Sequence, residues 1–271
     1  MRTLLRGGLI AALLVALALA VGSDRVPADP TAPLRITGDV VRAADPEGPL
    51  RIATFNIHGG KGPDGRTDLA RTAEALAGVD FAVLQEVRGG WRAGENQAAE
   101  LGNRLGLQAV FVAAERRWWR DGFGNGLLSR LPVEAIHRVP LVNTQGKSYR
   151  TATIAEIGHR GETVRVLAAH IARGADREAQ LQAVCRLFLS LESPAVLLGD
   201  LNTSADDPQL AALLAHPETT AVVGAGDAEQ GGATGIDWIL ARGLRRIRAE
   251  VRDHAASDHP AIYAELELLG Q

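Results

Sequence analysis

Eight polar residues of this sequence carry side chains suited to the hydrolysis of a charged ester, and most of them directly follow a short apolar run. Carboxylates and amide oxygens bind hard divalent cations, and imidazole exchanges protons near neutral pH. A side chain at the end of a buried strand stands at the rim of a sheet, where it can face a cleft. The residues are Asn56, Glu86, His170, Asp200, Asn202, Asp237, Asp258 and His259.

Each of these residues, taken singly, also has a structural interpretation. An aspartate after a strand often caps the next helix, and a histidine at the rim of a sheet is often a satisfied structural residue. The order of the whole set along the chain favours a functional site.

The elements that position these residues are apolar strands that alternate with helical stretches from Leu50 onward. Mixed continuous and alternating strands with amphipathic helices favour sheets packed between helices over a barrel or a helical bundle. Helices are predicted over 67–77, 173–191 and near 208–214. Strands are predicted at 34–41, 51–57, 81–84, 109–113, 126–129, 133–139, 151–157, 164–170, 195–198, 236–240, 247–251 and 261–266.

Several motifs resemble those of the endonuclease/exonuclease/phosphatase superfamily, the deoxyribonuclease I-like proteins. In that superfamily an early strand ends in Asn, here Asn56, and the next core strand ends in Gln-Glu, here Gln85-Glu86. His170 stands where many members have a strand-end histidine. The superfamily's later signatures follow in order as Gly199-Asp200-Leu201-Asn202, Ile236-Asp237-Trp238 and Ser257-Asp258-His259.

This resemblance implies an α/β (α+β) fold, a four-layer αββα sandwich of two mixed β-sheets packed face to face and flanked by helices. It also implies a metal-dependent phosphoric ester hydrolase, a phosphodiesterase that uses Mg²⁺ or Mn²⁺. The implied metal ligands are Glu86, Asp258 and Asn56. The implied substrate contacts are Asn56, Asn125 and Arg150, and the implied catalytic residues are His170, Asp200, Asn202, Asp237 and His259.

Phosphodiester chemistry explains why these residue types belong together. The substrate is anionic, water is a poor nucleophile, and the departing oxygen gains negative charge, which a cation on Glu86 would stabilise. His259 is the candidate base or transition-state donor, and Asp237 would fix its tautomer. His170, if protonated, would donate to a phosphate oxygen or the leaving group. Whether Asp200 or His259 takes the proton of the attacking water stays open.

Some positions near these motifs are ambiguous or depart from the superfamily pattern. Arg150 can place its guanidinium on a phosphate or be a solvated charge at a strand end. Asn125 lies in a segment that looks like the Gly-x-x-x-Leu-Ser-Arg-x-Pro element. His58 stands where some DNA-acting relatives carry Asp, and Gly235 stands where many carry Arg.

The N-terminal residues have the pattern of an export signal. Arg2 and Arg6 precede an uncharged stretch rich in Leu, Ala and Val, and Ala18-Leu19-Ala20 fits cleavage near Ala20. An uncleaved membrane anchor is the alternative, because the stretch nearly has the length of a spanning helix. We therefore predict a signal peptide or anchor over 1–22, a Pro/Asp-rich linker over 23–49 and one catalytic domain over 50–268, secreted or membrane-anchored and extracytoplasmic.

The charge of the chain bears on its substrate. The formal net charge is −3, whereas nucleic-acid-binding domains are usually basic. Arg116-Arg117-Trp118-Trp119-Arg120 could contact lipid headgroups, stack on a base or simply pack on the domain.

These observations favour a phosphodiesterase acting on a small or lipid-linked phosphoester. A secreted Mg²⁺-dependent endonuclease or exonuclease is the first alternative, and a non-catalytic binding module is the second. The expected partners are a phosphoester substrate (a small molecule, a lipid headgroup or a nucleic acid) and a membrane surface. No protein partner is inferred, and a monomer is expected.

Overall fold

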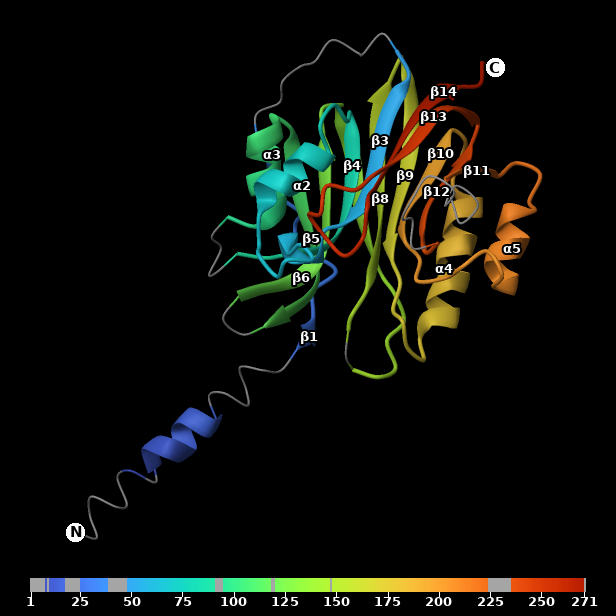
Figure 1. The fold of residues 1–271 in the computed structure, drawn as a ribbon. Helices are drawn as coiled ribbons and strands as arrows, with labels where there is room; N and C mark the ends of the chain where they lie inside the picture. Colours follow the sequence, from blue (N-terminus) through green and yellow to red (C-terminus); the bar gives the residue numbers. More distant parts are fainter. Residues whose placement is uncertain are drawn as a thin grey trace.

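Two mixed β-sheets packed face to face, with helices on their outer faces, form the body of the molecule (Figure 1). The computed structural model describes residues 8, 10–17, 25–38, 48–90, 95–117, 120–146, 148–223 and 235–270, and at 117, 120 and 121 only the backbone. Within this part of the chain the predicted four-layer sandwich is confirmed.

The first sheet has the strand order β1-β5-β6-β4-β3-β14-β13, and β2 pairs with β5. Strands β3 and β4 are parallel and the other neighbours are antiparallel. Helices α2 and α3 cover its outer face (Figure 1). The bounds are β1 Val26–Pro27, β2 Ile36–Thr37, β3 Leu50–Asn56, α2 Leu69–Ala75, β4 Phe81–Arg88, α3 Gln97–Leu105, β5 Gln108–Arg117, β6 Arg120–Ser129, β13 Leu244–Arg252 and β14 Ala261–Leu268.

The second sheet has the order β11-β12-β10-β9-β8-β7, in which β9 and β10 are the parallel pair. Helices α4 and α5 cover its outer face. The bounds are β7 Val133–Pro140, β8 Thr151–His159, β9 Glu162–His170, α4 Arg177–Ser190, β10 Ala195–Asp200, α5 Pro208–Leu214, β11 Thr220–Val223 and β12 Asp237–Arg242.

Three apolar layers hold this sandwich together, and each central strand contributes to two of them. Along β10, Val196 and Leu198 point into the layer between the sheets, whereas Ala195 and Leu197 point toward α4 and α5. Because helices cover the outer faces, both sides of such a strand are apolar and its sequence shows no alternation. Successive side chains still point to opposite faces, so parity along a strand tells which residues face the other sheet.

Helix α3 and strand β11 were not predicted. Helix α3 contains Gly102, a residue that lowers helix propensity. Its boundaries are nevertheless well defined, because the Asn96 side chain accepts a hydrogen bond from the Ala99 amide and Gly106 ends the helix in the left-handed conformation. The long predicted helix 173–191 begins only at Arg177, and the preceding residues form a loop.

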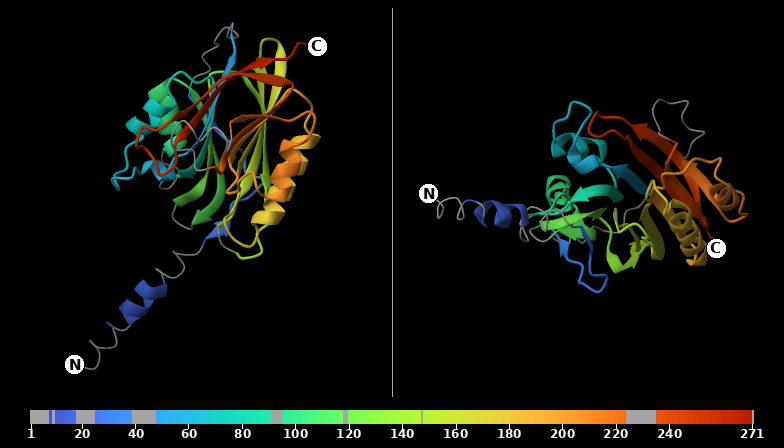
Figure 2. Two further views of the ribbon diagram at one scale, coloured as in Figure 1. Left: turned by 45° about the vertical axis from the view of Figure 1, so that its right-hand side comes forward. Right: turned by 90° about the horizontal axis from the view of Figure 1, so that it is seen from below.

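The N-terminal part of the described chain has two different surroundings. Residues 10–17 are helical, their side chains are exposed, and Figures 1 and 2 show them outside the sandwich. Among the described helices, none has the length and apolar character needed to cross a membrane. Residues 25–38, within the predicted linker, lie against the sandwich, because β1 and β2 pair with β5.

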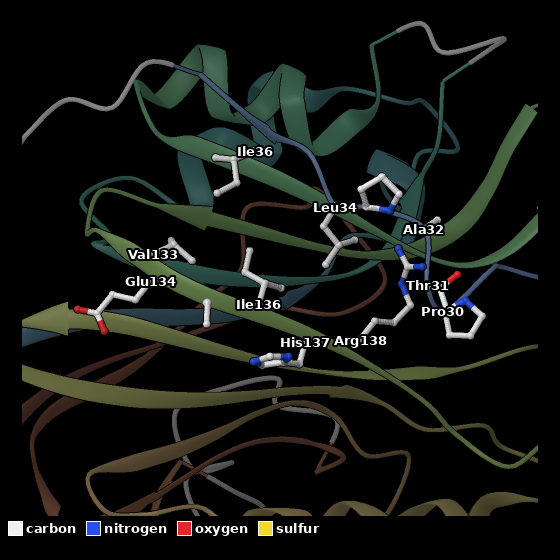
Figure 3. Close-up of a pocket in the computed structure, with 12 residues that line it drawn as sticks. Pro30, Thr31, Ala32, Leu34, Ile36, Val133, Glu134, Ile136, His137 and Arg138 are labelled. Atoms are coloured by element: carbon white, nitrogen blue, oxygen red, sulfur yellow. The ribbon is translucent and has the colours of Figure 1, made fainter.

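A groove of ≈ 450 Å³ separates this N-terminal segment from β7 (Figure 3). Leu34, Ile136 and Arg138 are among its lining residues. No predicted site residue lines it, so the groove is unrelated to the predicted chemistry.

Candidate active site

Three predicted catalytic residues lie side by side at one end of the second sheet. His170 is the last residue of β9, Asp200 is the last residue of β10, and Asp237 is the first residue of β12. The register pairs Asp200 with His170 on one side and with Asp237 on the other. All three have the parity of the strand residues that face the other sheet. Their side chains therefore meet at one end of the space between the two sheets, here called the mouth of the sandwich.

Asn56 connects this group to the first sheet. It is the last residue of β3, is buried, and donates a hydrogen bond from Nδ2 to Asp200 Oδ2 at 3.0 Å. Its backbone oxygen accepts a hydrogen bond from the Ser257 hydroxyl at 2.6 Å, so the loop that carries His259 is fixed to the same strand end. The amide of Asn56 orients the Asp200 carboxylate without adding charge.

Steric crowding explains why position 199 of the Gly199-Asp200 motif is a glycine. Strands β9 and β10 approach so closely here that a Cβ on Gly199 would lie 1.9 Å from the Ala169 carbonyl oxygen. The φ angle of Gly199, +153°, is also one that side chains rarely adopt. Glycine thus allows the close approach that brings Asp200 beside His170.

Asp237 and His259 form a buried pair joined by a short polar contact. Asp237 Oδ2 lies 2.7 Å from His259 Nδ1, and both side chains are almost fully buried. Burial alone would lower the pKa of His259, but the hydrogen bond and charge of Asp237, with Asp200, raise it above its usual value. The contact at Nδ1 leaves Nε2 as the ring nitrogen that can exchange a proton with substrate or water.

Asp200 is a buried carboxylate with hydrogen bonds from two sides. Besides Asn56, the backbone amide of Asn202 donates to its Oδ1 at 2.9 Å. Burial, then the nearby charge of Asp237, raises the pKa of Asp200 to about 6. Ligand atoms of Asp200, Asp237 and His259 lie within 4.8 Å of one another. A carboxylate with this pKa can hold or accept a proton close to neutral pH.

The surroundings of His170 disfavour the protonated ring that the sequence allowed for. Burial, and then the positive charges of Arg150 and His259, lower the pKa of His170 well below its usual value. Its Nε2 lies 3.7 Å from Asp200 Oδ2, too far for a hydrogen bond. This direction favours a neutral imidazole beside Asp200 over the charged donor that the sequence allowed for.

Asn202 connects two loops at the mouth. Its Nδ2 donates to the Ile171 carbonyl at 2.8 Å, and its Oδ1 accepts from Arg173 Nε at 2.8 Å. Asn202 has a left-handed backbone, φ 44°, which asparagine tolerates better than most residues.

Glu86 reaches the mouth through an irregularity of strand β4. The register of β4 against β6 shifts between Leu84 and Val87, and Glu86 has φ 59°. Such a bulge changes the direction in which a side chain points. Glu86 is half-buried, and among the described residues it makes no hydrogen bond or ion pair. A half-buried carboxylate of this kind fits an oxygen ligand for a hard cation.

Asp258 is the most exposed of the predicted ligands, with 58% of its side chain accessible. Its Oδ1 lies 3.2 Å from the Ser257 hydroxyl oxygen, whose proton goes to the closer Asn56 carbonyl, and 3.4 Å from His58 Nδ1. His58 therefore contacts Asp258.

The predicted substrate contacts have different environments. Asn125 is buried and donates from Nδ2 to the Thr151 carbonyl at 3.1 Å, so it connects β6 to β8 across the sandwich. Arg150 lies just before β8 with its guanidinium carbon 5.4 Å from the ring centre of Phe123. Burial lowers the pKa of Arg150, opposed by the charges of Glu86 and other carboxylates.

Two residues of this mouth, Phe123 and Arg88, were missed by sequence reasoning. The Phe123 ring centre lies 6.2 Å from that of His170, and the Arg88 guanidinium carbon lies 5.3 Å from the Phe123 ring centre. Neither belongs to a motif, and only the pairing of β4 with β6 brings them here. The segment 116–120 ends β5 and begins β6, but Trp118 and Trp119 lie outside the described residues.

Fold and site together define a two-sheet α/β sandwich with acidic, amide and imidazole groups at one end of the sheets. Residues 53–259 match the sequence model of the endonuclease/exonuclease/phosphatase family, and the chain belongs to this family. The family comprises hydrolytic phosphoesterases and nucleases that generally use a divalent metal ion. None of the curated proteins matches this chain.

Solved structures show the same fold. An endonuclease/exonuclease/phosphatase from Beutenbergia cavernae is similar with a TM-score of 0.65 and 23% identity, over 83% of this chain and 72% of that one. A humanized TDP2 from D. rerio has a TM-score of 0.59 and 19% identity, over 80% and 98% of the two chains. The human Nocturnin catalytic domain has a TM-score of 0.59 and 15% identity, over 83% and 96%. At sequence identities this low, the similarity shows only that the fold is shared.

Proposed function

We propose that this chain is an extracytoplasmic, metal-dependent phosphodiesterase that acts on a small or lipid-linked phosphoester. The observation that carries the proposal is the buried Asp237–His259 pair beside Asp200, with ligand atoms of all three within 4.8 Å. Fixed acid and base groups of this kind suit a proton transfer during attack by water.

The residues of the mouth divide this chemistry among them. Asp200, held by Asn56, orients the attacking water and accepts its proton, for which a pKa of about 6 is suitable. His259, held by Asp237, donates from Nε2 to a phosphate oxygen as negative charge develops. Arg150 offers its guanidinium to the phosphate from the β8 side of the mouth.

The donor set of the mouth fits Mg²⁺ or Mn²⁺. Glu86 supplies the carboxylate, with Asn56 and Asp258 as further oxygen donors, and hard cations prefer such ligands. When bound, the cation supplies charge stabilisation for the departing oxygen. The Asp200, Asp237 and His259 cluster suits a metal less well, because hydrogen bonds already engage Asp200 and pair Asp237 with His259.

Hydrolysis assays with residues 25–271 test the proposal. We expect hydrolysis of bis-p-nitrophenyl phosphate that needs Mg²⁺ or Mn²⁺, stops with EDTA and is lost in Asp200→Ala and His259→Ala. Phosphatidylinositol, sphingomyelin and a phosphomonoester complete the panel. Folded wild-type protein that is silent on every substrate would contradict the proposal and favour a binding module.

A nuclease is the second candidate, because the fold is also similar to that of a D. rerio TDP2 solved in complex with a single-stranded DNA product. The net charge of −3 favours the small or lipid-linked substrate instead. Plasmid DNA in the same panel discriminates between them. Cleavage that falls steeply with added salt would favour the nuclease, because binding to a nucleic-acid backbone releases counterions.

The extracytoplasmic location is supported by the sequence of residues 1–22, with Arg2 and Arg6 before an uncharged apolar run. Fusion of residues 1–24 to a reporter enzyme that becomes active only after export tests it. We expect an active reporter, and Arg2→Glu with Arg6→Glu should reduce export. A reporter that stays inactive would place the protein inside the cell.

A further inference from the structure

Arg88 and Arg150 place their guanidinium groups against the same aromatic ring. The guanidinium carbons lie 5.3 and 5.4 Å from the centre of the Phe123 ring. Arg88 belongs to the first sheet, and Arg150 lies just before β8 of the second sheet. The ring also neighbours catalytic His170, at 6.2 Å between ring centres. This arrangement therefore adjoins the proposed reaction centre.

The backbone fixes the partnership of Arg88 and Phe123. The two residues lie directly opposite each other in the β4–β6 ladder, so their side chains share one face of the sheet. Parity places that face toward the second sheet, because Leu127, four residues beyond Phe123 on β6, belongs to the central layer.

Contacts with Gln97 and Gly59 also fix the position of Arg88. Gln97 accepts a hydrogen bond from the Arg88 backbone amide at 2.9 Å and donates one to the Gly59 carbonyl at 2.7 Å. A Cβ on Gly59 would lie 3.0 Å from Arg88 Nε, and Gly59 has φ +63°. Because residue 59, in the turn after β3, is a glycine, the turn leaves room for the Arg88 side chain.

The two guanidinium groups remain available to an anion. In the part of the chain that the structure describes, neither lies within ion-pair distance of a carboxylate. The charges of Glu86, Glu115 and Asp200 nevertheless act on Arg150. Stacking on a ring engages the face of a guanidinium and leaves N–H groups at its edge, and such an edge matches two oxygens of a phosphate. One of these groups on Arg150, at Nη1, donates to the Tyr149 carbonyl at 3.3 Å. Arg150 can meet the single negative charge of the scissile phosphodiester, so the neighbouring Arg88 is a cation beyond what that group needs.

We infer that Arg88, held on Phe123 beside Arg150, forms a subsite for a second phosphate group, so that the preferred substrate is a phosphodiester that also carries a phosphate beside the bond to be hydrolysed. This inference deepens the proposed function and rests on it for the identity of the reaction. The subsite itself is defined by binding, which can be measured without turnover.

Calorimetric titration of the full chain in EDTA compares thymidine 3′,5′-bisphosphate with thymidine 5′-monophosphate. EDTA prevents hydrolysis and leaves the arginines as the binding cations. The wild-type protein should bind the bisphosphate at least about tenfold more tightly. This preference should fall to near unity in Arg88→Gln and in Phe123→Leu, and Arg88→Lys should keep only part of it, because a lysine has charge without the planar fork.

Arg186→Gln is the matched control, since Arg186 is exposed on α4 and loses the same charge. It should retain the preference for the bisphosphate. Equal affinity of the wild type for the two probes, or an undiminished preference in Arg88→Gln, would overturn the subsite. A preserved preference in a protein that hydrolyses nothing would contradict the proposed function and leave the subsite standing.

Discussion

At the scale of single residues, the contact of Asp237 with His259 determines how the imidazole can act. Asp237→Asn keeps the size of the side chain but removes the charge that raises the pKa of His259 and selects its tautomer. We expect kcat for bis-p-nitrophenyl phosphate to fall by about 10²–10⁴, with a small change in KM. Asp206→Asn, at an exposed aspartate, is the control. A kcat within twofold of wild type would show that Asp237 does not assist His259.

The raised pKa of Asp200 predicts that its carboxylate, although needed for activity, lowers the stability of the folded protein at pH 8. Its pKa is raised from 3.8 to about 6 in the folded protein, so the folded state binds a proton more strongly than the unfolded state does. The stability from this group is therefore fully present below about pH 4 and is lost as the pH rises through about 6. In EDTA at pH 8, Asp200→Asn should melt a few degrees above wild type although it is inactive, and the difference should shrink toward pH 4.

Thermal unfolding of wild type and Asp200→Asn at both pH values checks this expectation. Asp206→Asn should show no such pH-dependent difference, because Asp206 is exposed. If Asp200→Asn melts below wild type at pH 8, the hydrogen bonds of the carboxylate outweigh its burial, and the argument from the raised pKa fails.

At the scale of elements, the contact between β9 and β10 sets the geometry of the mouth. Gly199→Ala would place a Cβ 1.9 Å from the Ala169 carbonyl oxygen, so one strand must move. We expect a loss of about 2–4 kcal/mol in the free energy of unfolding, measured with urea, and loss of activity. Gly174→Ala is the matched control, because a Cβ there meets no atom within 4 Å. Similar stabilities of the two variants would contradict the steric argument.

The same elements show how far sequence can predict such a site. Strand ends at Asn56, His170 and Asp200 were predictable, because buried strands are apolar runs and a polar residue marks where each run ends. The bulge that redirects Glu86 depends on the register of β4 against β6, which leaves no local pattern in the sequence. The pairing of Arg88 with Phe123 has the same origin. Long-range pairing therefore limits the prediction more than local propensity does.

At the scale of the whole molecule, the exposed edge of β5 is covered by residues 25–38. Strands β1 and β2 pair with it, the Ala28 amide donates to the Ala114 carbonyl at 3.0 Å, and Thr37 Oγ1 donates to the Ala109 carbonyl at 3.1 Å. Leu34 packs against the central apolar layer. An uncovered edge strand with unpaired amides and carbonyls promotes association between chains. Residues 25–38 thus protect the sandwich as well as connecting it to the N-terminal segment.

Chains that begin at residue 25 and at residue 39 test this protective role. The shorter chain loses the pairing on β5 and exposes the surface beneath Leu34, so we expect a midpoint of thermal unfolding lower by several degrees and concentration-dependent association in light scattering. Leu34→Ser in the longer chain should lower the midpoint by less, because the strand pairing remains. Equal midpoints with monomeric behaviour of both chains would show that residues 25–38 are a linker without a stabilising role. The active-site residues all lie beyond residue 38, so the shorter chain keeps them. Any activity that it retains at low concentration would therefore measure how much of the sandwich is still folded.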